Sequence, residues 1–186
     1  MALAKAAMAQ NFFITGLPRS RTAWFAAYFS AYPDVWCWHE GLKGCAVPAE
    51  FCNRMQPLGP HPAELIIGNS DSGLPLMNLE IMFPDVPVIV IHRSFIDSVN
   101  SVMESMAINN PPQEMIDMLN RIHERMRYIK GLHVDFNDID ARMREICEWI
   151  GLEYREDIHK LYAPLNIQTM DSTADDKALK WLPFAQ

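Results

Sequence analysis

The sequence is poor in basic residues and in long apolar runs, and each shortage excludes a class of protein. Its 186 residues hold 16 lysines and arginines against 23 aspartates and glutamates, which gives a formal charge of −7. Binding to nucleic acid or to an anionic membrane surface needs a basic face, so this charge argues against both partners. No apolar run approaches the roughly 20 residues of a membrane span. Any anionic ligand must therefore be held by a local cluster of basic side chains.

The cysteines lack the spacing of a disulfide framework. Cys37, Cys45, Cys52 and Cys147 contain no Cys-x-x-Cys pair, which favours reduced thiols in a reducing compartment. A zinc site made from the first three of them together with His39 is the alternative, and its spacings do not match the common zinc fingers. We therefore expect a cytoplasmic protein that binds no metal.

Length and composition predict one domain over residues 1–186. A chain of this length with 49% hydrophobic residues can bury one sizeable core and is short for two. Residues 1–10 have a lysine inside their apolar part and no basic start, so we interpret them as a lead-in rather than a signal peptide. The tail 171–186, with Lys177 and Trp181, is expected to be flexible or to pack on the surface.

Short apolar runs alternate with helical patterns along the chain. The runs expected to form strands are 11–15, 35–38, 64–67, 86–91 and 132–136. The run 86–91 is apolar on both faces, as in a central strand of a parallel sheet. Helices are expected over 22–31, 75–83, from the cap Ser94 to before Asn109, 113–130, and from Asp138 or Asp140 to Ile150. The alternation predicts an α/β fold, a parallel sheet flanked by helices in three layers.

The first expected strand is followed by a loop suited to an anion. Ligands of open parallel sheets bind beyond the carboxyl ends of the strands, and here the chain reads Gly-Leu-Pro-Arg-Ser-Arg-Thr-Ala-Trp from Gly16 to Trp24. A loop that enters a helix aims backbone N–H groups at one point, which favours phosphate or sulfate. Aligned on Gly16, the nucleotide-triphosphate pattern would need Gly, Lys and Ser/Thr at Arg21, Thr22 and Ala23. The lysine and the magnesium-binding hydroxyl are missing, so a phosphotransferase is the least favoured alternative.

The same loop resembles the 5′-phosphosulfate loop of the sulfotransferases that use 3′-phosphoadenosine 5′-phosphosulfate (PAPS). The matching residues are Pro18-Arg19-Ser20-x-Thr22-x-Trp24. The resemblance implies a P-loop-like sulfotransferase fold, with Arg19 as the catalytic cation and Ser20 and Thr22 on the phosphate. It implies that the donor is bound by seven consecutive residues: Pro18, Arg19, Ser20, Arg21, Thr22, Ala23 and Trp24. Arg21 stands where the family usually has glycine, and Ala23 where it usually has a hydroxyl.

A second match follows the run 86–91. Sulfotransferases have an arginine at a strand end and a serine eight residues later, which together hold the 3′-phosphate of the donor, and Arg93 and Ser101 reproduce that interval. Taken singly, these residues are better interpreted as a surface salt bridge and an ordinary helix serine. Together with the first loop, in the same order and on the matching elements, they favour the functional interpretation. The resemblance covers most of residues 11–155 and is weakest over 45–62 and after Tyr162.

A hydroxyl acceptor must lose a proton as it attacks sulfur, which calls for a base. The resemblance implies a glutamate or histidine after the second strand, so Glu40 is the first candidate and His39 the second. The alternatives are that Glu40 is a solvated loop carboxylate and that His39 is a histidine packed among the neighbouring tryptophans. Relatives often have a lysine near Ser70, where this chain has none; residues 69–71 are expected to line the acceptor pocket or to form a turn.

These features predict a transferase that moves a sulfuryl group from PAPS to a hydroxyl or amine of an unknown small-molecule or peptide acceptor. The nucleotide product is adenosine 3′,5′-bisphosphate (PAP). The sulfuryl group carries a single negative charge, so basic side chains and backbone donors are expected to suffice without a metal. The alternative is a catalytically degenerate nucleotide-binding or regulatory domain of the same fold.

Overall fold

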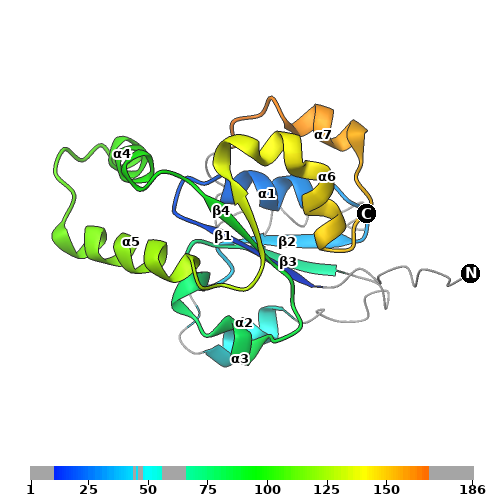
Figure 1. Ribbon diagram of the computed structural model, residues 1–186, viewed down its shortest axis with the longest axis horizontal. Coiled ribbons are helices and arrows are strands. Elements are labelled where there is room, and N and C mark those ends of the chain that lie inside the picture. Colours follow the sequence, from blue (N-terminus) through cyan, green and yellow to red (C-terminus); the bar gives the residue numbers. More distant parts are fainter. Residues whose placement is uncertain (1–10, 44, 46–47, 56–65, 168–186) are drawn as a thin grey trace, which may run out of the picture.

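Five parallel strands form one sheet in the computed structural model, which describes residues 11–43, 45, 48–55 and 66–167 (Figure 1). The strands are β1 (Phe12–Gly16), β2 (Val35–His39), β3 (Ile66–Ser70), β4 (Val88–His92) and β5 (Leu132–Asp135). Their order across the sheet is β2-β3-β1-β4-β5. The strand β1 is thus central, and the carboxyl ends of all five strands meet at one edge.

Helices cover both faces of this sheet, which confirms the expected three-layer α/β fold. One face carries α1 (Thr22–Phe29), α6 (Ile139–Trp149) and α7 (Glu156–Tyr162), and the other carries α2 (Pro48–Arg54), α3 (Leu79–Met82) and α5 (Gln113–Met126). Figure 1 shows α1, α6 and α7 above the strands and α2 and α3 below them, with α5 and α4 (Phe95–Met106) together at one side. Short 3₁₀ turns lie at η1 (Leu74–Leu76) and η2 (Phe136–Asp138).

The strand β4 is apolar on both faces because each face packs against a helix layer. In β4, Ile89 and Ile91 lie in the core with α1 and α6, whereas Val88 and Val90 lie in the core with α5. Trp24 and the other aromatic side chains of α1 fill the first of these cores. The expectation of a central strand over residues 86–91 is confirmed, with bounds shifted to 88–92.

The third strand is longer than predicted. The sequence places its end at Ile67, but β3 continues through Ser70, which pairs with His39 on one side and Ile14 on the other. Neighbours on both sides supply the backbone hydrogen bonds, so the pairing overrides the low strand preference of glycine and asparagine. The predicted turn at residues 69–71 therefore begins only after Ser70.

The helix expected over 75–83 is broken in two. Met77 is extended, with φ −90° and ψ 163°, and separates η1 from α3. Because of this break, Leu74 and Leu79 are both buried while Ile81 remains exposed. The helices α2 and α7 fall in segments for which no helix is expected.

The cap of α6 also differs from the prediction. Asp138 occupies the N-cap position, but its side chain makes no capping hydrogen bond. The side chain of Asp135 instead accepts from the backbone N–H of Asn137 at the start of η2. Asp140, the other predicted cap, instead contacts Arg21 before α1 and His159 on α7. The expected cap at Ser94 is confirmed, because its side chain accepts from the N–H of Asp97.

Candidate functional site

The loop between β1 and α1 is tightly folded. The backbone N–H of Ser20 donates to the carbonyl of Leu17, and Arg19 and Arg21 have φ angles of 69° and 61°. A side chain at Gly16 would place a Cβ 2.9 Å from the carbonyl oxygen of Ile91, so this position needs glycine. The positive φ at Arg21 explains in physical terms why a glycine is usual there in the family that the loop resembles.

The start of α1 presents free backbone donors beside this loop. The first helical hydrogen bond runs from the N–H of Phe25 to the carbonyl of Arg21. The N–H groups of residues 22–24 precede it and have no acceptor within the helix. In addition, Ser20 is fully buried, and its Oγ makes no hydrogen bond with any residue that the structure describes. This arrangement is suited to a phosphate or sulfate group, which accepts several hydrogen bonds at one point.

The structure brings Arg19, Arg93 and Ser101 together. The Nε of Arg19 donates to the Oγ of Ser101 at 3.3 Å, although the two residues are 82 positions apart. Arg93 donates from Nη1 to the carbonyl oxygen of Arg19, and its guanidinium lies over the ring of Phe136, 4.7 Å from the centroid. The two stretches predicted to form the donor site therefore meet at one place.

This place holds two positive charges close together. The pKa of Arg93 is lowered, mainly by partial burial and also by the charge of Arg19, while Asp97 and Glu104 oppose the shift. A bound anion would offset the repulsion between the two guanidinium groups. Two guanidinium groups thus lie close together in a chain whose net charge is −7, with the charges of Asp97 and Glu104 acting on one of them.

The side chains of Arg21 and Trp24 lie away from this place, and that of Ala23 is buried. The guanidinium of Arg21 stacks on the Trp24 ring and pairs with Asp140 on α6, with Nη1 3.1 Å from Oδ1. Trp24 is 1% exposed, and its Nε1 donates to the carbonyl of Tyr162. Ala23 and Trp24 could therefore contact the donor only through their backbone N–H groups.

The two candidate bases lie at the carboxyl end of β2. The Nδ1 of His39 lies 3.3 Å from the carbonyl oxygen of Ser70, and its Nε2 lies 3.9 Å from the Oε1 of Glu40. Glu40 has a φ of 54° and a half-exposed side chain, which also faces the Nζ of Lys43 at 3.8 Å. Burial lowers the pKa of His39, although the charge of Glu40 opposes this shift.

The segment predicted to line an acceptor pocket or form a turn makes a turn from Asp71, whose Oδ1 accepts from the N–H of Gly73, and it also holds the chain that follows His39. Asn69 accepts from the N–H of Gly41, and Asp71 accepts from the N–H of Leu42, each at 2.9 Å. The carbonyl of Ser70 accepts from the N–H of Glu40. Asn69 and Ser70 are fully buried and Asp71 is 4% exposed. Through these hydrogen bonds, the three buried residues fix the position of the candidate bases.

A histidine pair that no sequence pattern marks includes His92, which lies beside Arg93 in the chain. The Nε2 of His92 lies 2.7 Å from the Nδ1 of His133, and the Nε2 of His133 lies 2.9 Å from the carbonyl of Ile129. Since a carbonyl only accepts, the His133 Nε2 carries a proton, and its Nδ1 accepts from His92 when His133 is neutral. Burial and the neighbouring His133 lower the pKa of His92. The contacts of Phe136 with Arg93 and of Asp140 with Arg21 were not predicted either, because no motif marks them.

Among the described residues there is no group of three or more histidine, cysteine or acidic side chains placed to hold a metal ion. The four cysteines are free thiols, and Cys37 and Cys147 are buried. Within the same part of the chain, every helix is too short or too polar to cross a membrane.

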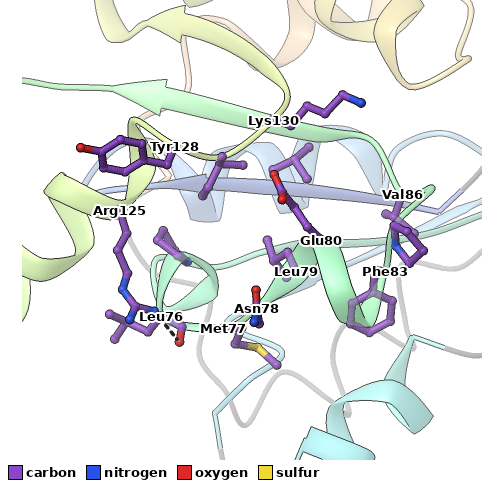
Figure 2. A pocket seen from close by; sticks show the side chains of 14 residues that line it. Leu76, Met77, Asn78, Leu79, Glu80, Phe83, Val86, Arg125, Tyr128 and Lys130 are labelled. Atoms are coloured by element: carbon purple, nitrogen blue, oxygen red, sulfur yellow. Dashed lines mark hydrogen bonds between the residues drawn. The ribbon is translucent and has the colours of Figure 1, made fainter.

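A hollow of about 420 Å³ lies away from the predicted site (Figure 2). It is bounded by η1, α3 and the residues that follow α5, and it reaches the amino end of β4 at Val86 and Val88. Figure 2 shows Arg125 at its margin, where the guanidinium meets the carbonyl of Leu76. The predicted donor residues are at the opposite end of the strands, and none of them lines this hollow.

Comparison with known proteins gives matches at the level of structure. No family model and no curated protein matches the sequence. A mouse sulfotransferase, SULT7A1, complexed with PAP has a TM-score of 0.56 and 13% identity over 83% of this chain. This chain spans 63% of the length of that mouse structure.

Two bacterial structures are also similar. A sulfotransferase from Alicyclobacillus acidocaldarius has a TM-score of 0.51 and 14% identity, over 83% of this chain and 92% of its own. The sulfotransferase domain of the olefin synthase from Synechococcus PCC 7002 has a TM-score of 0.55 and 16% identity, over 95% of this chain and 90% of its own. The chain therefore has the α/β fold of the sulfotransferases, as the resemblance of its first loop predicts.

Proposed function

We propose that the protein is a sulfotransferase that takes a sulfuryl group from PAPS and transfers it to a hydroxyl or amine of an acceptor. The observation that carries this proposal is the contact of Arg19 with both Ser101 and Arg93 at the carboxyl edge of the sheet. In open parallel sheets this edge is the usual place for a ligand. The fold neighbours support the same class of reaction.

The chemistry of the site fits a nucleotide with an anionic group at each end. Arg93 and Ser101 would hold the 3′-phosphate. The N–H groups of residues 22–24, with the hydroxyl groups of Ser20 and Thr22, would hold the phosphosulfate end. The buried Oγ of Ser20, which has no partner among the described residues, gives independent support for a ligand at this end.

When bound, PAPS supplies an activated sulfuryl group that moves by in-line displacement. Arg19 would stabilise the negative charge that develops as the bond from sulfur to the leaving oxygen breaks. Because the sulfuryl group carries one negative charge, we expect guanidinium and backbone donors to be sufficient, and we propose that the reaction needs no metal.

We propose that His39 accepts the proton of the acceptor, with Glu40 as its partner. The contact of Nδ1 with the Ser70 carbonyl requires a proton on Nδ1, which leaves a lone pair on Nε2 when the ring is neutral. The lowered pKa of His39 favours that neutral form. Since β3 lies between β1 and β2, the base is two strand spacings, about 10 Å, from β1, so the acceptor would lie over β3.

Isothermal titration calorimetry with PAP tests the donor site without knowledge of the acceptor. The unmodified protein should bind PAP, and Arg93→Ala should abolish binding, because the 3′-phosphate loses its main cation. Arg121→Ala is the matched control, since it removes an exposed arginine from α5 and should leave the affinity unchanged. An unmodified protein that binds no PAP would end the proposal.

The second candidate is a nucleotide-binding domain without turnover. One observation favours it: Ser70 is a fully buried strand residue near the place where the resemblance implies a lysine that bridges donor and acceptor. Binding of PAP without release of PAP from PAPS across a broad panel of hydroxyl and amine acceptors would support this candidate over the enzyme.

A further inference from the structure

Arg21 has a backbone conformation that favours glycine, yet its side chain is firmly held. A φ of 61° costs a residue with a Cβ about 1 kcal/mol or more relative to glycine. The guanidinium lies 4.2 Å from the centre of the Trp24 ring, and its Nη1 lies 3.1 and 3.2 Å from the two carboxylate oxygens of Asp140. The side chain therefore makes contacts that glycine could not make.

Asp140 is in turn connected to α7. Its Oδ1 lies 3.5 Å from the Nε2 of His159, and the Nδ1 of His159 lies 2.6 Å from the hydroxyl of Tyr154. The side chain of His159 is 13% exposed, and its ring meets that of Tyr28 on α1 edge to face. Asp140 thus receives a hydrogen-bond donor from the loop on one side and from a largely buried histidine on the other.

We propose that Asp140 is a positioning residue for the donor loop and acts through Arg21. By holding the guanidinium against Trp24, it keeps the loop in the conformation that presents the N–H groups of residues 22–24, and it keeps the Arg21 side chain away from the place where the anion binds. The inference rests on the proposed function, because it takes the loop to be the nucleotide site. Asp140 makes no contact with the nucleotide in this account.

The direction in which the affinity for the anion changes distinguishes a positioning role of Asp140 from a long-range effect of its charge. Removing a carboxylate near an anion site should tighten anion binding if only the long-range charge matters. Loss of a positioning contact should instead weaken binding, because the free loop samples conformations that do not bind. Asp138 provides the matched control, since it is an exposed carboxylate at the N-cap of the same helix and its side chain makes no capping bond.

The experiment is a double-mutant cycle read by calorimetry with PAP. Asp140→Asn should weaken PAP binding about two- to fivefold, the range for a partly exposed ion pair in which one guanidinium nitrogen meets both carboxylate oxygens. The same change in the Arg21→Gly background should have no effect, because the guanidinium is gone. Asp138→Asn should leave the affinity unchanged or raise it slightly. Equal or tighter binding by Asp140→Asn, or an equal loss in both backgrounds, would overturn the inference.

Amide hydrogen exchange tests the loop without any nucleotide. The N–H groups of Ser20 and Phe25 donate to the carbonyls of Leu17 and Arg21, so their protection reports the loop conformation. Asp140→Asn should speed their exchange severalfold, whereas Asp138→Asn should not; equal protection in both variants would contradict the inference. If the unmodified protein binds no PAP, the proposed function fails, and this measurement still decides whether Asp140 positions the loop.

Discussion

His39 and Glu40 are neighbours in the sequence but differ in their surroundings. The side chain of His39 is 11% exposed and that of Glu40 is 46% exposed. Burial disfavours the imidazolium and lowers the pKa of His39, while the charges of Glu40 and Asp71 raise it in part. A base must be neutral to accept a proton, so this environment makes His39 competent near neutral pH.

An NMR titration of the His39 ring should give a midpoint below the ordinary value of 6.5. Glu40→Gln should lower the midpoint further, because it removes the carboxylate that favours the imidazolium. Turnover should accordingly fall only when the pH drops through that midpoint, since the protonated ring has no lone pair on Nε2. His39→Asn identifies the signal. A midpoint above 6.5, or a rise after Glu40→Gln, would contradict this assignment.

At the scale of elements, the packing of β3 against its neighbours requires a glycine at position 68. A Cβ at Gly68 would overlap the ring of Phe12 and would lie 2.9 Å from the Sγ of Cys37. Phe12 is fully buried and packs edge to face against Phe29, so its ring cannot move aside without disturbing the core between the sheet and α1.

Gly68→Ala should therefore lower the free energy of unfolding by about 1–3 kcal/mol, measured by urea denaturation. Gly73→Ala is the control, because its Cβ would meet only side-chain atoms of Asp71 and Leu42, each at 3.2 Å. The control should lose clearly less stability. Equal losses in the two variants would show that crowding at Phe12 is not the cause.

The elements also show what periodicity predicts and what it misses. The run at 86–91 is recognisable because both of its faces are apolar, and α5 is recognisable because its apolar residues recur every three or four positions on one face. The end of β3 is not recognisable from the sequence. Gly68 and Asn69 belong to the strand only because β1 and β2 pair with it on either side. The break at Met77 likewise depends on which leucines reach the core.

On the scale of the whole molecule, a net acidic chain brings two arginines together at one edge of its sheet. The sequence predicts this cluster because Arg19 and Arg93 each follow a strand, and parallel strands end at the same edge. It does not predict that Arg21 turns to Asp140 or that Asn69 and Asp71 hold the turn after His39. Those contacts depend on how helices and loops pack against one another, which no local pattern encodes.

The proposed function depends on Arg19, Arg93 and Ser101 forming one site for an anionic nucleotide. A crystal structure of the protein grown with PAP tests this most directly. We predict that the 3′-phosphate contacts Arg93 and Ser101 and that the 5′-phosphate lies against the N–H groups at the start of α1. A nucleotide bound in the hollow of Figure 2, or one that contacts neither arginine, would contradict the account.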